Sequence, residues 1–103
     1  MFHLLADIPS GLPDELVERL ATSEHVRIER IVSWGHASPE GFWYDQPEHE
    51  WVMVVKGAAG LLFEAQPTPV VLKEGDALVI AARLRHRVEW TETPTIWIAV
   101  HYH

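Results

Sequence analysis

The chain has 103 residues, with eight Lys and Arg against fifteen Asp and Glu, and a formal net charge of −7. This length fits a single domain over residues 1–103, and the negative charge disfavours nucleic acid and anionic lipid, so we expect neither partner. The sequence has no Cys, which removes disulfides, thiolate metal sites and cysteine nucleophiles and fits a reducing compartment.

We expect no targeting signal in the first eight residues. They include His3 and Asp7, and they lack the basic flank and the long apolar run of a signal peptide. No stretch approaches the ~18 consecutive apolar residues of a membrane span. We therefore expect a cytoplasmic protein.

A helix is expected near the start of the chain. Residues 10–15 place a capping serine, a proline and two acids ahead of Leu16 and Leu20. This pattern predicts one short helix over residues 13–22, within an N-terminal helical extension of residues 1–24.

Strands are expected from residue 25 to residue 103. Val26 and Ile28 alternate with charged residues, and the pair Ile31–Val32 then changes the phase, as a β-bulge does. This first strand covers residues 25–35. Six more strands, separated by turn residues, are expected at 50–56, 60–64, 70–73, 77–81, 87–90 and 95–102. Many short strands without a second helix favour an all-β sandwich or barrel.

Two motifs occur in order along these strands. Glu50 and Gly57 enclose six residues, and a later segment runs from Gly75-Asp76 to His86. In this ordered pair the sequence resembles the cupin family, over roughly residues 26–102. The resemblance implies a double-stranded β-helix, or jelly-roll, barrel.

The resemblance also implies a metal site built on the first-motif Glu and the second-motif His, which are Glu50 and His86 here. The two upstream His of the family are missing, and Gln46, on the same strand face as Glu50, is the weak third ligand. The implied ion is divalent: Fe, Mn, Ni or Zn. The alternative is a hydrogen-bonded Glu50–His86 pair that lines a pocket without metal.

Other residues are candidates for the pocket wall. Tyr44 and Asp45 stand near the positions of the missing His, and Trp90 is one of several aromatic residues expected to line the pocket. His36 and His101 are open candidates for joining the site.

An apolar strand face predicts self-association. Trp51, Met53 and Val55 share the strand face opposite to Glu50. An exposed face of this kind is typical of subunit contacts, so we expect a homodimer, and cupin-like domains often pair.

Three functions remain open. The first is a small metal-dependent enzyme acting on an oxygen-rich metabolite, and the second is a pocket that binds or senses a small molecule without turnover. The third is a metal-independent isomerase or epimerase of sugar-type substrates, which needs an acid–base pair such as Tyr44 and His86 within hydrogen-bond distance.

Overall fold

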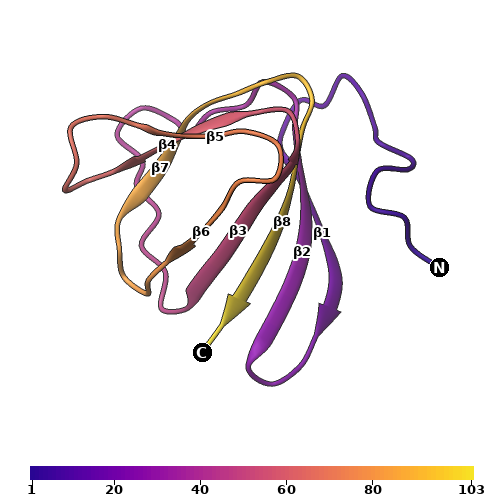
Figure 1. Ribbon diagram of the computed structural model, residues 1–103, viewed down its shortest axis with the longest axis horizontal. Coiled ribbons are helices and arrows are strands. Elements are labelled where there is room, and N and C mark those ends of the chain that lie inside the picture. The colour runs from indigo at the N-terminus through magenta and orange to yellow at the C-terminus, as the bar shows by residue number, and fades with distance from the viewer.

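The computed structural model describes all residues, 1–103, and contains eight strands and no helix. The strands are β1 (Leu16–Thr22), β2 (Val26–Ser33), β3 (His49–Lys56), β4 (Ala59–Phe63), β5 (Val70–Leu72), β6 (Ala77–Ile80), β7 (His86–Thr91) and β8 (Thr95–Tyr102). They form a five-stranded sheet ordered β1-β2-β8-β3-β6 and a three-stranded sheet ordered β5-β4-β7 (Figure 1). Every pairing is antiparallel. The expected all-β jelly-roll barrel is confirmed, and no helix suited to crossing a bilayer is present.

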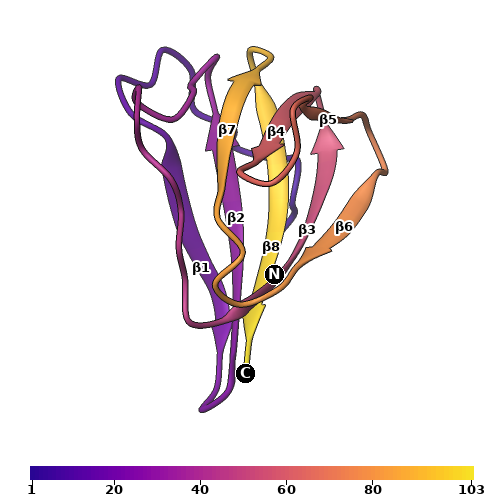
Figure 2. The same cartoon turned by 90° about the vertical axis from the view of Figure 1, so that its left-hand side faces the viewer.

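The core lies between the two sheets. Figure 2 shows β4, β5 and β7 against the upper part of the long strands β2, β8 and β3. Val54 and Trp97 from the larger sheet and Leu61 and Leu72 from the smaller one belong to one buried cluster, each at most 3% exposed. Truncating such a side chain typically costs about 2–5 kcal/mol. This shared core fixes the distance between the sheets, and with it the space enclosed beside the core.

The helix expected over residues 13–22 is wrong, because this segment forms β1. Its residues pair with β2, beginning with Leu16 opposite Val32. A helix of this length is marginal in water on its own, whereas β1 gains a hydrogen-bonded ladder and a place at the edge of the larger sheet. The helical extension of residues 1–24 is wrong for the same reason, since the sheet starts at Leu16.

A buried arginine holds the N-terminal segment against this sheet. Arg30 on β2 is 3% exposed. Its Nε donates to Glu18 Oε1 at 2.7 Å, and its Nη1 donates to the carbonyl oxygens of Leu4 and Ala6, both at 3.0 Å. The guanidinium also lies 4.9 Å from the centre of the Phe2 ring. These partners supply what a buried charge requires, and they are distant in sequence, which explains why local pattern did not identify β1.

The bulge expected at Ile31–Val32 is also wrong. β2 pairs with β8 without interruption from Val26 to Ser33. Ile31 faces a cavity and Val32 is fully buried on the other face, so the two adjacent apolar residues reflect burial on both faces of the strand. The other six expected strands lie within one residue of the observed bounds.

The two motif glycines offer a matched test of the fold. Gly57 and Gly75 both have φ of +87°, but a Cβ at Gly57 would lie 2.5 Å from the Pro94 carbonyl oxygen, whereas nothing lies within 4 Å at Gly75. We expect Gly75→Ala to lower the free energy of unfolding by about 1–2 kcal/mol, from backbone strain alone. Gly57→Ala should lower it by about 3–4 kcal/mol, because Pro94 must also move. Urea unfolding measures both, and equal losses would contradict the steric argument.

Candidate functional site

A cavity of about 220 Å³ opens between the two sheets. Fifteen residues line it, eight of them hydrophobic, including Val52, Leu61, Tyr44 and Trp97. The other seven are Glu15, Arg27, Glu29, Gln46, Glu50, His86 and His101. Sites for drug-sized ligands usually enclose ~300–1,000 Å³. The cavity therefore suits a small metabolite held by a mixture of apolar and polar contacts.

Glu50 projects into this cavity from β3. The alternation of the strand places Glu50 and Val52 on the inner face, and the ladder sets Glu50 opposite His101 on β8 and Ile80 on β6. Its side chain is 11% exposed. Gln46 Nε2 lies 3.4 Å from Glu50 Oε1 and donates to it. The carboxylate is therefore placed by sheet register and has one amide donor.

His86, the first residue of β7, faces Glu50 from the other sheet. Its main chain pairs with that of Tyr44 through two hydrogen bonds of 2.7 and 3.2 Å. Its Nδ1 lies 2.9 Å from the Leu84 carbonyl oxygen, and because a carbonyl only accepts, Nδ1 is the donor. His86 Nε2 then faces Glu50 Oε1 at 3.8 Å. The expected meeting of Glu50 and His86 at one site is what the structure shows.

Tyr44 lies beside His86 but does not bond to its ring. The two rings stack with centroids 5.3 Å apart, and no hydrogen bond joins the Tyr44 hydroxyl to the imidazole. Burial raises the pKa of the Tyr44 phenol above 10.0, and the charges of Glu15 and Glu50 raise it further. The phenol is therefore neutral at ordinary pH and lines the cavity as a hydrogen-bond donor and an aromatic wall.

His101 joins the site, whereas His36 does not. His101 Nε2 lies 3.2 Å from Glu29 Oε1 and 3.9 Å from Glu50 Oε2. Its Nδ1 is buried without a hydrogen-bond partner. The sequence spacing could have indicated His101: it lies four residues after Trp97 on β8, so the two side chains share the inner strand face. His36 Nδ1 instead accepts from the Trp34 amide at 2.8 Å, and this residue lies outside the cavity.

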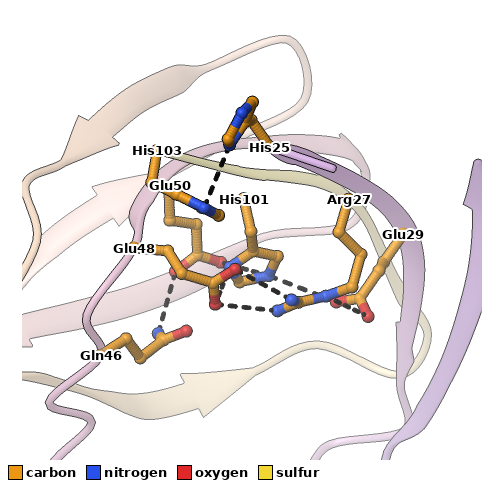
Figure 3. Close-up of polar contacts among 8 residues, drawn as sticks. All are labelled: His25, Arg27, Glu29, Gln46, Glu48, Glu50, His101 and His103. Atoms are coloured by element: carbon orange, nitrogen blue, oxygen red, sulfur yellow. Dashed lines mark hydrogen bonds and ion pairs between the residues drawn. The ribbon is translucent and has the colours of Figure 1, made fainter. Parts of the chain in front are cut away.

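A charged group that sequence reasoning missed lies next to His101. Arg27 donates from Nη1 and Nη2 to the two oxygens of Glu48, at 2.9 and 3.2 Å, and from Nε to Glu29 at 3.0 Å (Figure 3). Burial lowers the pKa of Arg27, but the hydrogen bonds and charges of Glu48 and Glu29 outweigh it and the net shift is upward. The pairing joins β2 to the segment before β3, which no local pattern could indicate.

Two residues expected on the pocket wall lie outside it. Asp45 is exposed and pairs with Arg83 at 3.4 Å, because it alternates with Tyr44 and Gln46, which face inward. Trp90 is 38% exposed. The register of β7 against β4 shifts by one residue near Glu89, so Trp90 turns away from the inner face.

The residues of the cavity do not fit the implied metal ion. No three His, Cys, Asp or Glu side chains are grouped so that they could hold one. His86 and His101 face different oxygens of Glu50, and Gln46 turns its N–H, not its oxygen, toward the carboxylate. A metal ligand set needs lone pairs that converge on one point. The three residues predicted as ligands lie close together in the cavity. They are Glu50, His86 and Gln46, and they contact one another instead of converging on one point.

Solved structures give a consistent relationship. A protein of Ralstonia eutropha JMP134 with the provisional name mannose-6-phosphate isomerase is 50% identical, with a TM-score of 0.96 over 99% of this chain and 96% of that one. A cupin superfamily protein of Desulfitobacterium hafniense DCB-2 is 18% identical, with a TM-score of 0.77 over 92% and 83% of the two chains. A cupin-2 domain protein of Shewanella frigidimarina NCIMB 400 is 15% identical, with a TM-score of 0.69 over 85% and 80%.

The chain has the cupin fold, and it belongs to the same family as the Ralstonia protein. The two more distant structures share its fold. The Ralstonia protein shares the fold and also has the same residue at half of the positions. No protein-family model and no curated protein matches the sequence. This agrees with a first motif that lacks both upstream His.

Ionisation of Tyr44 tests the polarity of the cavity. We expect its phenol, followed by ultraviolet titration and identified with Tyr44→Phe, to ionise above pH 10.0. Glu50→Gln should shift it part of the way down, since burial, the larger cause, remains. Because the folded-state pKa is raised, the contribution of Tyr44 to stability is complete below pH 10.0 and declines as pH rises through the folded-state pKa. Ionisation at or below pH 10.0 would contradict this description.

Proposed function

We propose that the cavity binds a small polyhydroxylated metabolite and transfers a proton on it, as a sugar-type isomerase or epimerase does. The observation that carries the proposal is the buried Glu50–His86 pair, whose facing atoms lie 3.8 Å apart on the cavity wall. This distance is too long for a direct hydrogen bond. It leaves both atoms available to a ligand.

The hydrogen bonding of His86 defines the chemistry of this pair. Since Nδ1 donates to Leu84, a neutral His86 turns a lone pair toward a carboxylate, and two acceptors then face each other. One proton on Nε2 removes this conflict and makes an acid beside a base. A ligand hydroxyl can then lie between them, accepting from His86 Nε2–H and donating to Glu50 Oε1.

An isomerisation needs only these two groups. Glu50 takes the proton from the carbon next to the substrate carbonyl, and His86 Nε2–H donates its proton to the carbonyl oxygen, which yields an enediol. His86 then takes the proton of the other enediol hydroxyl while Glu50 returns its proton to the neighbouring carbon. All protons are returned and no oxidant or reductant is consumed.

The relative of known structure supports this class of reaction. The Ralstonia protein, 50% identical over nearly the whole chain, carries a provisional isomerase name. The proposal requires no metal ion, because the cavity side chains form no convergent ligand set. The Glu50–His86 pair replaces the Tyr44–His86 pair considered from the sequence, since the Tyr44 hydroxyl makes no bond to the ring.

Exchange of substrate hydrogen with solvent tests the reaction directly. In D₂O, the wild-type protein should catalyse deuterium incorporation beside the carbonyl of a small aldose or ketose, followed by NMR. Glu50→Gln and His86→Asn should each lower the rate about 10²–10⁴-fold, the usual contribution of a positioned acid or base.

The control for this assay is Glu64→Gln, which removes a carboxylate that is paired with Arg85 outside the cavity. It should retain the wild-type rate. Chelator-treated protein, checked by elemental analysis after incubation with Fe, Mn, Ni or Zn salts, should also retain it. Activity that survives in Glu50→Gln, or that appears only with a bound metal, would contradict the mechanism. Sugar binding without deuterium exchange would contradict the isomerase and support the alternative, a module that binds a small molecule without turnover.

We also propose that two copies associate through the outer face of the larger sheet. Trp51 lies opposite Val100 and Val79 on the neighbouring strands, and Met53 lies opposite Ile98. These side chains form one apolar, uncharged surface. None of these side chains carries part of the net charge of −7, so two copies can pack through this face without like charges meeting.

The oligomeric state tests this surface. Light scattering after size exclusion should give the mass of a dimer for the wild type and that of a monomer for Met53→Lys, because a buried unpaired charge opposes association. Val71→Lys, an exposed apolar position on β5 of the other sheet, is the matched control and should remain dimeric. A wild-type monomer at high concentration would refute the dimer.

A further inference from the structure

We infer that the cavity takes an uncharged sugar-like ligand and disfavours phosphorylated ones, because its single arginine is paired with carboxylates of the protein and the wall carries three further carboxylates. The inference rests on the proposed function, since it names the ligand class of the same cavity. Arg27 is the only Lys or Arg among the lining residues, whereas three carboxylates, Glu15, Glu29 and Glu50, line the same space.

The positive charge of Arg27 is already paired with two carboxylates. Three of its N–H groups are donated to carboxylates, two in a bidentate pair with Glu48 and one to Glu29. Figure 3 shows the guanidinium between these two acids, with His101 beside them. Such planar pairing is the arrangement that an arginine also uses to bind phosphate. Glu48 therefore occupies the Nη1–Nη2 edge of the guanidinium, to which a phosphate would otherwise bind.

The three arginines that flank His86 in the sequence do not compensate. Arg83 and Arg85 pair with Asp45 and Glu64 and do not line the cavity. Arg87 lies near Glu89 at 3.6 Å and donates to main-chain carbonyls. A phosphate dianion that entered would meet more negative than positive charge in a partly dehydrated space, which is costly.

The rest of the wall suits neutral hydroxyl groups. Glu29 and Glu50 accept hydrogen bonds from hydroxyls, and His86 Nε2 can accept or donate. Trp97 already donates its indole N–H to Ser33 at 3.1 Å, so it offers only apolar surface to the ligand. Together with Val52 and Leu61 it provides a face for the C–H groups of a sugar ring.

The test compares mannose with mannose 6-phosphate, and adds inorganic phosphate, by calorimetry. Wild-type protein should bind the phosphorylated sugar no more tightly than mannose. Glu48→Gln frees Arg27 and should raise the affinity for mannose 6-phosphate and phosphate about tenfold, with mannose unchanged. Glu64→Gln removes the same charge outside the cavity and should change neither affinity.

Two outcomes would overturn the inference. One is a wild-type protein that binds mannose 6-phosphate more tightly than mannose, a comparison that needs no variant to fold. The other is a folded Glu48→Gln protein, verified by its thermal unfolding, that gains no affinity for phosphate relative to Glu64→Gln. If the wild type binds neither sugar but Glu48→Gln gains phosphate binding, the role of Arg27 holds while the proposed function fails.

Discussion

The site depends on one constraint, the burial of the Glu50 carboxylate inside an apolar barrel. A carboxylate in such a place must be compensated by donors or charges. The sheets provide three partners: His86 across the cavity, His101 in register on β8, and Gln46 on the preceding segment. His86 and His101 are held by strand pairing, and the Gln46 carbonyl oxygen accepts from the Arg83 amide, so main-chain hydrogen bonds set the geometry of the site.

A second layer of charge surrounds this centre. His101 lies between Glu50 and Glu29, and Glu29 shares Arg27 with Glu48. A chain of polar contacts therefore runs from the cavity centre toward β2. Interactions in such networks are mutually dependent, and removing one member leaves another unpaired.

The sequence predicted the strands from residue 26 onward and the meeting of Glu50 with His86, because alternation and turn residues report local backbone structure and the motifs report the barrel. It mispredicted β1, whose stability comes from β2 and from Arg30. It could not identify Arg27 and Glu29 as cavity residues, since their placement depends on long-range register. The cytoplasmic location and the dimer stay predictions.

The irregularity of β7 near Glu89 has a consequence for the cavity itself. On a regular strand, Trp90 would share the inner face with His86 and Val88. Its indole would then enter the space between the sheets and fill much of it. The extra residue turns this side chain outward, over Gly60, where no Cβ obstructs it. The cavity of this barrel therefore depends on one inserted backbone position, and a deletion there would let the indole fill it.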